Sequence, residues 1–295
     1  MSETRLMKTE QSTVASKRFA DKVISQYEAE TGMKSDVSDY QKTLAQHMFL
    51  KIDSTLKELE AKRVGSKAPF TWENVNMRKL ALDTVNRVQL GLDALIPAHI
   101  YVIPYWSDSE KKYTLDLRVG YRGELFYRKE MTSEKVKDIR IELVYETDEF
   151  EAIMKDAEHD VETYTLHVTK PFDRGNIVGG IAYIVFEDQT MNKLVMLSEA
   201  DMRKAESFSR SSDFWKRFPA EMRYKTLVHR AMAYLPIDPR KTNALAYMAV
   251  EDDENEAERG YREIPKPIEQ ETVEFAEADI ATDEGKETAE EQPDF

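Results

Sequence analysis

The hydropathy pattern of this 295-residue chain changes its period along the sequence, and this limits the folds available to it. In the first ninety residues apolar side chains recur every three or four positions, which is the spacing of one face of an α-helix. Two such stripes are present: Tyr40, Leu44, Met48, Ile52, Leu56 and Leu59, then Met77, Leu80, Ala81, Val85, Val88 and Leu92. The segment GSKAPFT between them is predicted to be a turn, with Thr71 as the N-cap of the second helix.

Beyond residue 100 the period becomes two, which predicts half-buried β-strands. Leu115, Leu117 and Val119 alternate with polar residues, and this strand is expected to pair with the run IYVIPY through a turn at Ser107–Lys111. Further strands are predicted for DIRIELVY, VETYTLHV, IVGGIAYIVF and KLVMLS, with EDQTMN as the turn between the last two.

The strands are followed by a second helical region. Ser198 and Asp201 have the spacing of a capping box at the start of a helix. The run FWKRFPAEMRYKTLVHRAMAYLP predicts one long amphipathic helix with Pro219 in its first turn. The whole order is N-terminal helices, a five- or six-stranded, mainly antiparallel sheet with an inserted helix, and C-terminal amphipathic helices. This order predicts an α+β fold.

The acidic charge of the chain lies at its C-terminal end. The formal net charge is −14, and residues 251–295 contain 18 acids against four bases, which accounts for all of it. Such a segment cannot bury enough apolar surface to offset the entropy lost on ordering, so we expect a disordered acidic tail at residues 251–295. The remaining chain is expected to form an N-terminal helical region at residues 1–70 and an α+β core at residues 71–250.

The sequence lacks the residues and motifs that several classes of protein function require. The chain has no cysteine, no apolar run long enough for a membrane span and no signal peptide, so a cytoplasmic protein is expected. The segment GNIVGG lacks the Lys and Ser/Thr of a nucleotide-binding loop. Asp156, Glu158, His159 and Asp160 resemble a metal site, but a solvated loop is favoured for this polar segment. We therefore expect no enzyme activity, no catalytic residues, no bound metal and no cofactor.

Positive charge is concentrated in two stretches, of which the first spans residues 111–140 and has nine bases against five acids. It contains VGYRGELFYRKE, which predicts a strand, a GYRG turn and a helix. Gly120 and Gly123 would allow a phosphodiester to approach the amides at the helix start, with Arg118 and Arg122 bonding to it. The alternative is that both glycines serve only the turn.

The second stretch, residues 201–241, has ten bases against five acids. Arg223 and Arg230 lie two helical turns apart on one face, which predicts either a row of phosphate contacts or a solvated basic face. The aromatic residues Phe208, Phe214, Trp215 and Phe218 interleave with bases, a mixture suited to single-stranded nucleic acid but also to core packing. The residues predicted to bind DNA are Lys111, Lys112, Arg118, Tyr121, Arg122, Arg128, Lys129, Arg210, Trp215, Lys216, Arg217, Arg223, Lys225 and Arg230.

Three segments together resemble the RecT family of phage single-strand annealing proteins, which includes Redβ-type recombinases. They are QLGLDALIPAHIYVIPYW, LRVGYRGELFYRKE and DFWKRFPAEMRYKTLVHRAMAYLP, within a similar region from about Trp72 to Lys241. The resemblance implies ATP-independent binding of single-stranded DNA, annealing of complementary strands and DNA recombination. It also implies a homo-oligomer, as a ring or helical filament, and partners such as a phage exonuclease and the host single-stranded-DNA-binding protein.

Two other interpretations stay open at this stage. A phage scaffolding or assembly protein would need only helices, self-association and an acidic tail, and it would not have to bind oligonucleotides. A metal-dependent nuclease would rest on the Asp156 cluster alone and would degrade strands when magnesium is added.

Overall fold

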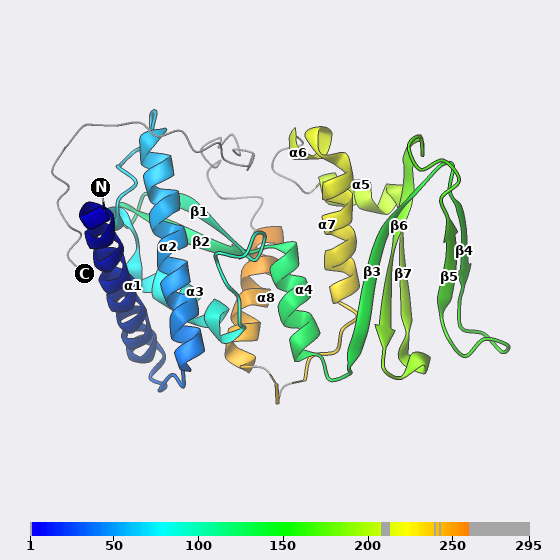
Figure 1. Ribbon diagram of the computed structural model, residues 1–295, viewed down its shortest axis with the longest axis horizontal. Coiled ribbons are helices and arrows are strands. Elements are labelled where there is room, and N and C mark those ends of the chain that lie inside the picture. The colour runs from blue at the N-terminus through cyan, green and yellow to red at the C-terminus, as the bar shows by residue number, and fades with distance from the viewer. Residues whose placement is uncertain (1, 208–212, 239, 242, 260–295) are drawn as a thin grey trace. The chain divides into compact units, whose positions relative to one another are not determined.

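The computed structural model describes the backbone of residues 2–207, 213–238, 240–241 and 243–259, and within these the side chains of residues 14–251. The described residues form two compact units. Unit 1 consists of residues 2–85 and 102–117, and unit 2 consists of residues 86–101 and 118–259. Helices α and strands β are labelled as in Figure 1, and η denotes a short 3-10 helix.

Unit 1 is built on long helices, as the hydropathy stripes predict. Helices α1 (Ser2–Thr31) and α2 (Asp39–Ala61) lie side by side (Figure 1). The predicted α2 stripe is confirmed, because its members Leu44, Met48, Ile52 and Leu56 are all buried. Tyr40, at the first turn of α2, is 63% exposed and lies outside the core.

Aromatic rings join these helices to the following segment. The rings of Phe19, Phe49 and Trp72 lie with centroids 5.2 to 5.6 Å apart. The Trp72 indole nitrogen donates to a carboxylate oxygen of Asp53 at 3.1 Å, so the polar end of this buried ring is satisfied.

The N-cap predicted for the second helix is wrong. Thr71 precedes the short 3-10 helix η1 (Trp72–Asn74) and makes no side-chain cap bond. Helix α3 (Met77–Gln89) begins later, where the Asn76 side chain accepts from the backbone amides of Arg78 and Lys79. Asn76 therefore satisfies the amides that the helix start leaves unpaired.

The predicted hairpin is confirmed. Strands β1 (Ile100–Ser107) and β2 (Lys112–Val119) pair, and the turn between them contains Lys111 with a φ of 55°. Alternate residues of β2, namely Tyr113, Leu115 and Leu117, are buried.

Unit 2 contains a three-stranded antiparallel sheet in the order β3-β6-β7. Strand β3 covers Val136–Tyr145, β6 covers Ile177–Phe186 and β7 covers Lys193–Ser198. Helix α7 (Pro219–Met232) lies along one face of this sheet (Figure 1). The core between them includes Ala182 and Ile184 from β6 and Leu227, Val228 and Ala231 from α7.

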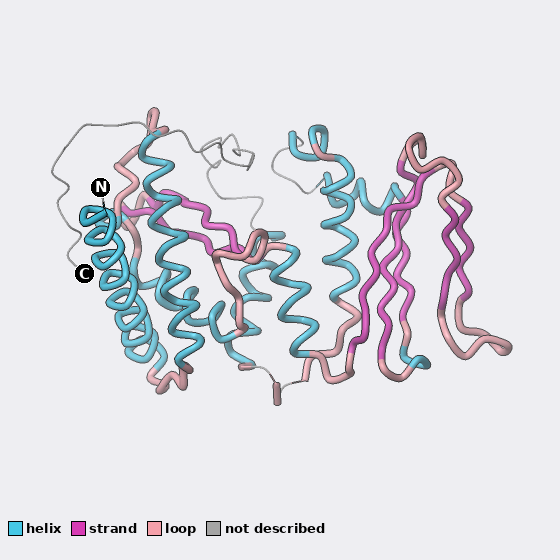
Figure 2. The backbone as a smooth tube through the Cα atoms, in the orientation of Figure 1, coloured by secondary structure: helices cyan, strands magenta, loops and turns pink. Residues whose placement is uncertain are grey.

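The other face of the sheet is covered by a second antiparallel hairpin, β4 (Glu149–Ile153) and β5 (Thr163–His167). Phe150 and Tyr164 of this hairpin pack against Ile181 and Tyr183 of β6. The short acidic strand β4 was not predicted. The single sheet expected from the sequence is wrong in this respect, because the described strands form three separate groups (Figure 2).

The remaining helices of unit 2 confirm an α+β fold with one corrected boundary. They are α4 (Tyr121–Met131), η2 (Gln189–Met191), α5 (Glu199–Ser207), α6 (Asp213–Arg217) and α8 (Ala244–Arg259). The capping box of α5 is confirmed by reciprocal bonds between Ser198 and Asp201. The single long helix predicted over α6 and α7 is interrupted at Phe218, because the following Pro219 restricts the backbone before it and begins a new helix.

The first part of the acidic segment is helical, whereas the sequence predicted disorder from residue 251. Helix α8 continues from Ala244 to Arg259, so residues 251–259 are helical, and residues 260–295 lie outside the described residues. The described part of the chain contains no helix that is both long and apolar enough to cross a membrane.

Candidate nucleic-acid interface

Helices α4 and α7 bring the two basic stretches of the sequence together within unit 2. Tyr121 of α4 meets Tyr224 of α7 edge to face, with ring centroids 6.0 Å apart. A ring nitrogen of His229 on α7 lies 3.1 Å from a carboxylate oxygen of the buried Glu124 on α4. The candidate site is therefore formed by residues that are about one hundred positions apart in the sequence.

The glycines at the start of α4 are explained by the close approach of another backbone segment. A Cβ at Gly120 would lie 2.3 Å from the Ala98 carbonyl oxygen, and one at Gly123 would lie 2.5 Å from the His99 carbonyl oxygen. The amide of Gly120 donates to His99 and the amide of Gly123 donates to Ala98. These two amides are occupied, so the glycines give no separate support for a phosphate cradle.

An arginine with several rings around it lies at the exposed surface beside this helix start. Arg122 is exposed, and its guanidinium carbon lies 5.9 Å from the centre of the Tyr121 ring. Burial raises the pKa of the Tyr101 and Tyr224 phenols, and the positive charge of Arg122 acts in the opposite direction on both. Arg122 is therefore electrostatically coupled to rings from β1, α4 and α7.

Phe126 extends this surface along α4. It lies one helical turn after Arg122, is 37% exposed, and its ring centroid is 5.3 Å from that of the buried His99. Burial lowers the pKa of His99, the charge of Asp93 opposes this shift, and the charge of Arg122 makes a smaller contribution that lowers it. We call the surface formed by Tyr101, Tyr121, Arg122, Phe126 and Tyr224 the Arg122 patch.

Three members of the patch, Tyr101, Phe126 and Tyr224, were not among the residues predicted from the sequence. Tyr101 is 46% exposed between two buried neighbours of β1, which the period-two pattern of that segment could have indicated. The i, i+4 spacing of Arg122 and Phe126 could likewise have indicated a shared helix face.

Two residues predicted to contact DNA, Arg223 and Arg128, are instead buried and form ion pairs with carboxylates. The Arg223 guanidinium makes two bonds to the Glu199 carboxylate, of 2.7 and 2.5 Å, and a third to the Pro219 carbonyl oxygen. Arg128 is 8% exposed and bonds to Glu251 at 2.5 Å. These guanidinium groups already have protein partners, so neither residue is presented to a phosphate.

The predicted row of arginines on α7 is consequently wrong. Arg223 is buried against α5, whereas Arg230, two turns later, is exposed. The position of the two arginines on the same face of α7 could not reveal this difference in exposure, because α5 packs against only part of α7.

The other predicted residues have varied surroundings. Trp215 is 5% exposed and belongs to the core, and Arg118 is half-buried. Arg210 and Phe208 lie outside the described residues. The exposed residues are Lys129, Lys216, Arg217, Lys225 and Arg230 of unit 2 and Lys111 and Lys112 of unit 1.

The acidic cluster considered as a metal site forms a local turn. One carboxylate oxygen of Asp156 accepts from the backbone amides of Glu158 and His159 and lies 2.9 Å from a ring nitrogen of His159. No group of three or more metal-ligating side chains occurs in the part of the chain that the structure describes.

An α+β unit that presents an arginine among exposed rings has the character of a nucleic-acid-binding protein. The model of the RecT family matches residues 66–268, which is more than half of the chain, so the chain belongs to the RecT family. Membership gives it a function in DNA recombination by single-strand annealing. A comparison with curated proteins found no match.

Proposed function

We propose that this protein binds single-stranded DNA on the Arg122 patch and anneals complementary strands without ATP, as a homo-oligomer in phage homologous recombination. Family membership supports the annealing function. The observation that supports the location is the exposed Arg122 coupled to tyrosines from three elements. Arg128 and Arg223 have no direct role in this proposal, because both are engaged by carboxylates.

In the proposed mechanism, phosphates of the first strand bind the exposed cations and bases contact the exposed rings. Arg122 offers a charge-assisted hydrogen bond to a phosphate, and Lys129 and Lys225 on the same pair of helices add screened attraction. Tyr101 and Phe126 offer faces on which bases stack without sequence preference. Base edges then stay available to a second strand.

The energy for annealing would come from the DNA itself. Stacking contributes about 1.4 kcal/mol per base-pair step, so a correctly paired duplex is favoured without nucleotide hydrolysis. The absence of a nucleotide-binding loop from the sequence supports this part of the proposal. The protein would lower the repulsion between strands and hold the first strand in an accessible form.

The partners proposed for this function are a phage exonuclease, which would supply single strands, and the host single-stranded-DNA-binding protein. The acidic segment that ends the chain, with 18 acids in its last 45 residues, is the region proposed to recruit them. A polyanionic segment suits partners with basic surfaces.

The experiment that tests this function mixes two complementary, fluorescently labelled oligonucleotides with the protein and no nucleotide. We expect duplex formation faster than without protein, unchanged by added ATP. Annealing that requires ATP would contradict the proposal, and a protein that binds no oligonucleotide would favour a scaffolding role. Strand loss that depends on magnesium and is stopped by a chelator would indicate a nuclease.

A further inference from the structure

Two apolar side chains of the described residues are far more exposed than the rest. Phe172 is 102% exposed and Val64 is 89% exposed, whereas the next large apolar side chain, Tyr40, is 63% exposed. Each lies at the tip of a loop, Phe172 in unit 2 and Val64 in unit 1. Burial of such a phenylalanine ring against a partner would be favourable in water.

The Phe172 loop, residues 168–176, is held in place by bonds to the neighbouring connection between β3 and β4. The Arg174 guanidinium makes two bonds to the Asp148 carboxylate, at 3.0 and 2.5 Å, and lies 4.1 Å from the centre of the Tyr145 ring. The Thr169 hydroxyl donates to the Thr147 carbonyl oxygen at 2.6 Å. These bonds hold a conformation in which the Phe172 ring itself touches little of its own chain.

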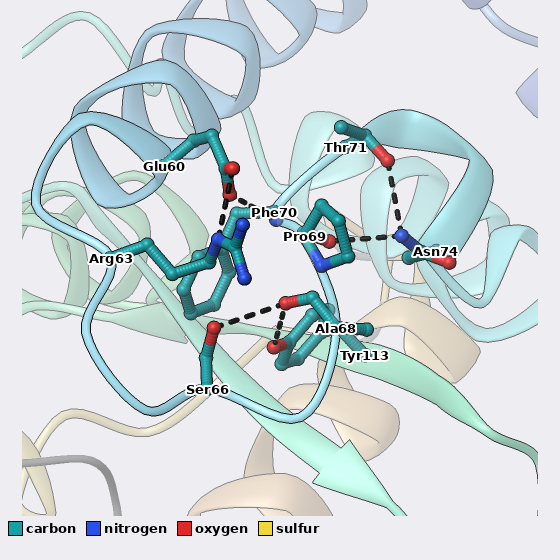
Figure 3. Close-up of polar contacts among 9 residues, drawn as sticks. All are labelled: Glu60, Arg63, Ser66, Ala68, Pro69, Phe70, Thr71, Asn74 and Tyr113. Atoms are coloured by element: carbon teal, nitrogen blue, oxygen red, sulfur yellow. Dashed lines mark hydrogen bonds and ion pairs between the residues drawn. The ribbon is translucent and has the colours of Figure 1, made fainter.

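The Val64 loop, residues 62–69, is held in a similar way (Figure 3). The Glu60 carboxylate accepts from the Arg63 side chain at 2.9 Å and from the Phe70 amide at 2.8 Å. The Ala68 carbonyl oxygen accepts from the hydroxyls of Ser66 and Tyr113, at 3.1 and 2.7 Å. Residues on both sides of Val64 are therefore anchored, and the Val64 side chain itself is exposed.

The surroundings of the two tips have opposite charge. Residues 146–149 and 168–176, around Phe172, contain four acids and two bases. Residues 62–69 together with residues 108–112, which are the hairpin turn and the first residue of β2, contain five bases and two acids. An ion pair of 2.7 Å between Lys67 and Asp108 joins these two segments. Lys62, Lys111 and Lys112 are exposed members of this basic surface.

We propose that the Phe172 loop of one copy of this chain docks against the Val64 loop of another copy, joining copies head to tail. An apolar contact surrounded by opposite charges fits a protein partner of this kind. A phosphate backbone fits Phe172 poorly, because the net acidic surroundings would repel it. A contact between two different surfaces of the same chain repeats from copy to copy and generates a ring or a filament.

The proposed contact is small. A buried phenylalanine covers about 150–250 Å², whereas a stable interface buries about 1,200–2,000 Å². We therefore expect association that weakens on dilution and strengthens when several copies bind one DNA strand. This inference rests on the proposed function in one respect, which is that the protein acts as a homo-oligomer. The experiment below measures DNA binding separately from docking, so that the two proposals can fail independently.

The absence of cysteine from the chain permits a clean crosslinking experiment on the full-length protein. Two variants, V64C and F172C, are prepared separately, mixed under mild oxidation with and without a single-stranded oligonucleotide, and analysed by non-reducing electrophoresis. We expect a disulfide-linked dimer in the V64C and F172C mixture, more of it with DNA, and little in either variant alone. M191C is the matched control, since Met191 is 45% exposed in another turn of unit 2.

Several outcomes would overturn the proposal. Crosslinking of V64C with M191C to the same extent would mean random collision, and a doubly substituted V64C/F172C chain that closes only on itself would mean an intramolecular contact. No crosslink in a mixture that still binds DNA would refute the docking and leave the proposed function intact. No DNA binding by the unmodified protein would instead contradict the proposed function.

A second measurement does not depend on disulfide geometry. Phe172→Ser and Val64→Ser should each lower the average mass in sedimentation, with folding and DNA binding by dilute protein unchanged, whereas Met191→Ser should not change the mass. The effect should be partly lost at high salt, where charge attraction is screened. A Phe172→Ser variant with unchanged mass but weaker DNA binding would assign Phe172 to nucleobase stacking and overturn the proposal.

Discussion

Arg122 and Arg223 are both arginines, but they lie in different environments and therefore have different interactions. Arg122 is exposed among rings, and its donors are available to a ligand. Arg223 is 9% exposed and bonds to Glu199 and Pro219, so it holds α7 against the start of α5. Whether an arginine binds phosphate depends on what already accepts its hydrogen bonds.

We predict that Arg122→Ala weakens binding of single-stranded DNA about tenfold at low salt. Removing one phosphate contact should also reduce the slope of log affinity against log salt by about 0.7. Fluorescence anisotropy with a labelled oligonucleotide at several salt concentrations measures both quantities.

Arg140→Ala is the matched control, because Arg140 is an exposed arginine of β3 that pairs with Asp138. It should change affinity and slope little. Equal losses in the two variants would show that Arg122 acts only through the general charge of the protein.

We predict that Arg223→Ala lowers the free energy of unfolding by about 3 kcal/mol, because it leaves the partly buried Glu199 without its main partner. The bond from Arg223 lowers the pKa of Glu199, so this stabilisation is fully present above the pKa of an unfolded glutamate, about 4.3, and is lost as the pH falls through the lowered pKa of Glu199. Urea unfolding at pH 7 and pH 3 should therefore show a smaller difference between variant and parent at pH 3. A folded Arg223→Ala variant with normal stability but reduced DNA affinity would contradict this prediction and would show that Arg223 contributes to DNA binding.

At the level of elements, the start of α4 depends on contact between backbones. The carbonyl oxygens of Ala98 and His99 accept from the amides of Gly123 and Gly120, and the non-glycine residue Ala98 has a φ of 61°. An alanine in this left-handed region is strained, and the hydrogen bonds around it maintain that conformation. This contact places Tyr101 and Arg122 near each other.

We predict that Gly123→Ala destabilises the protein by about 2 kcal/mol or more, since its Cβ would lie 2.5 Å from the His99 carbonyl oxygen. The backbone shift that relieves this contact should also weaken DNA binding. Thermal unfolding and anisotropy measure the two effects.

Glu130→Ala on the exposed side of the same helix is the control and should change stability by less than about 0.5 kcal/mol. A Gly123→Ala variant as stable as the parent would contradict the importance of this backbone contact.

At the level of the whole molecule, the acidic segment consists of a helical part, residues 251–259, and residues 260–295, which lie outside the described residues. Glu251, at the start of the segment, bonds to Arg128 and Tyr127 and so belongs to the folded unit. Residues 260–295 carry 12 acids and three bases. Tethered near cations of the same chain, these carboxylates would compete with DNA phosphates.

We predict that a chain ending at Arg259 stays folded, anneals DNA and binds it as tightly as the full chain or more tightly, most clearly at low salt. A chain ending at Val250 should be less stable by about 3 kcal/mol, because the buried Arg128 loses its carboxylate partner. Calorimetry and anisotropy on both truncated proteins distinguish the two parts. Loss of DNA binding by a folded chain ending at Arg259 would place part of the DNA site in the acidic segment.

The sequence alone determined the α+β class, the α2 stripe, the β1-β2 hairpin and the strand-turn-helix around Gly120, and the tertiary structure then decided which side chains are exposed. The first set depends on residues close in the chain, whose period and turn chemistry are local. The second set depends on residues that are distant in the chain. Arg128 is buried against Glu251, 123 positions away, and Arg223 is buried against Glu199, 24 positions away. The ring neighbours of Arg122 likewise come from separate elements. Hydropathy periodicity carries no information about which distant carboxylate reaches a given guanidinium, because that choice is made by the packing of one element on another.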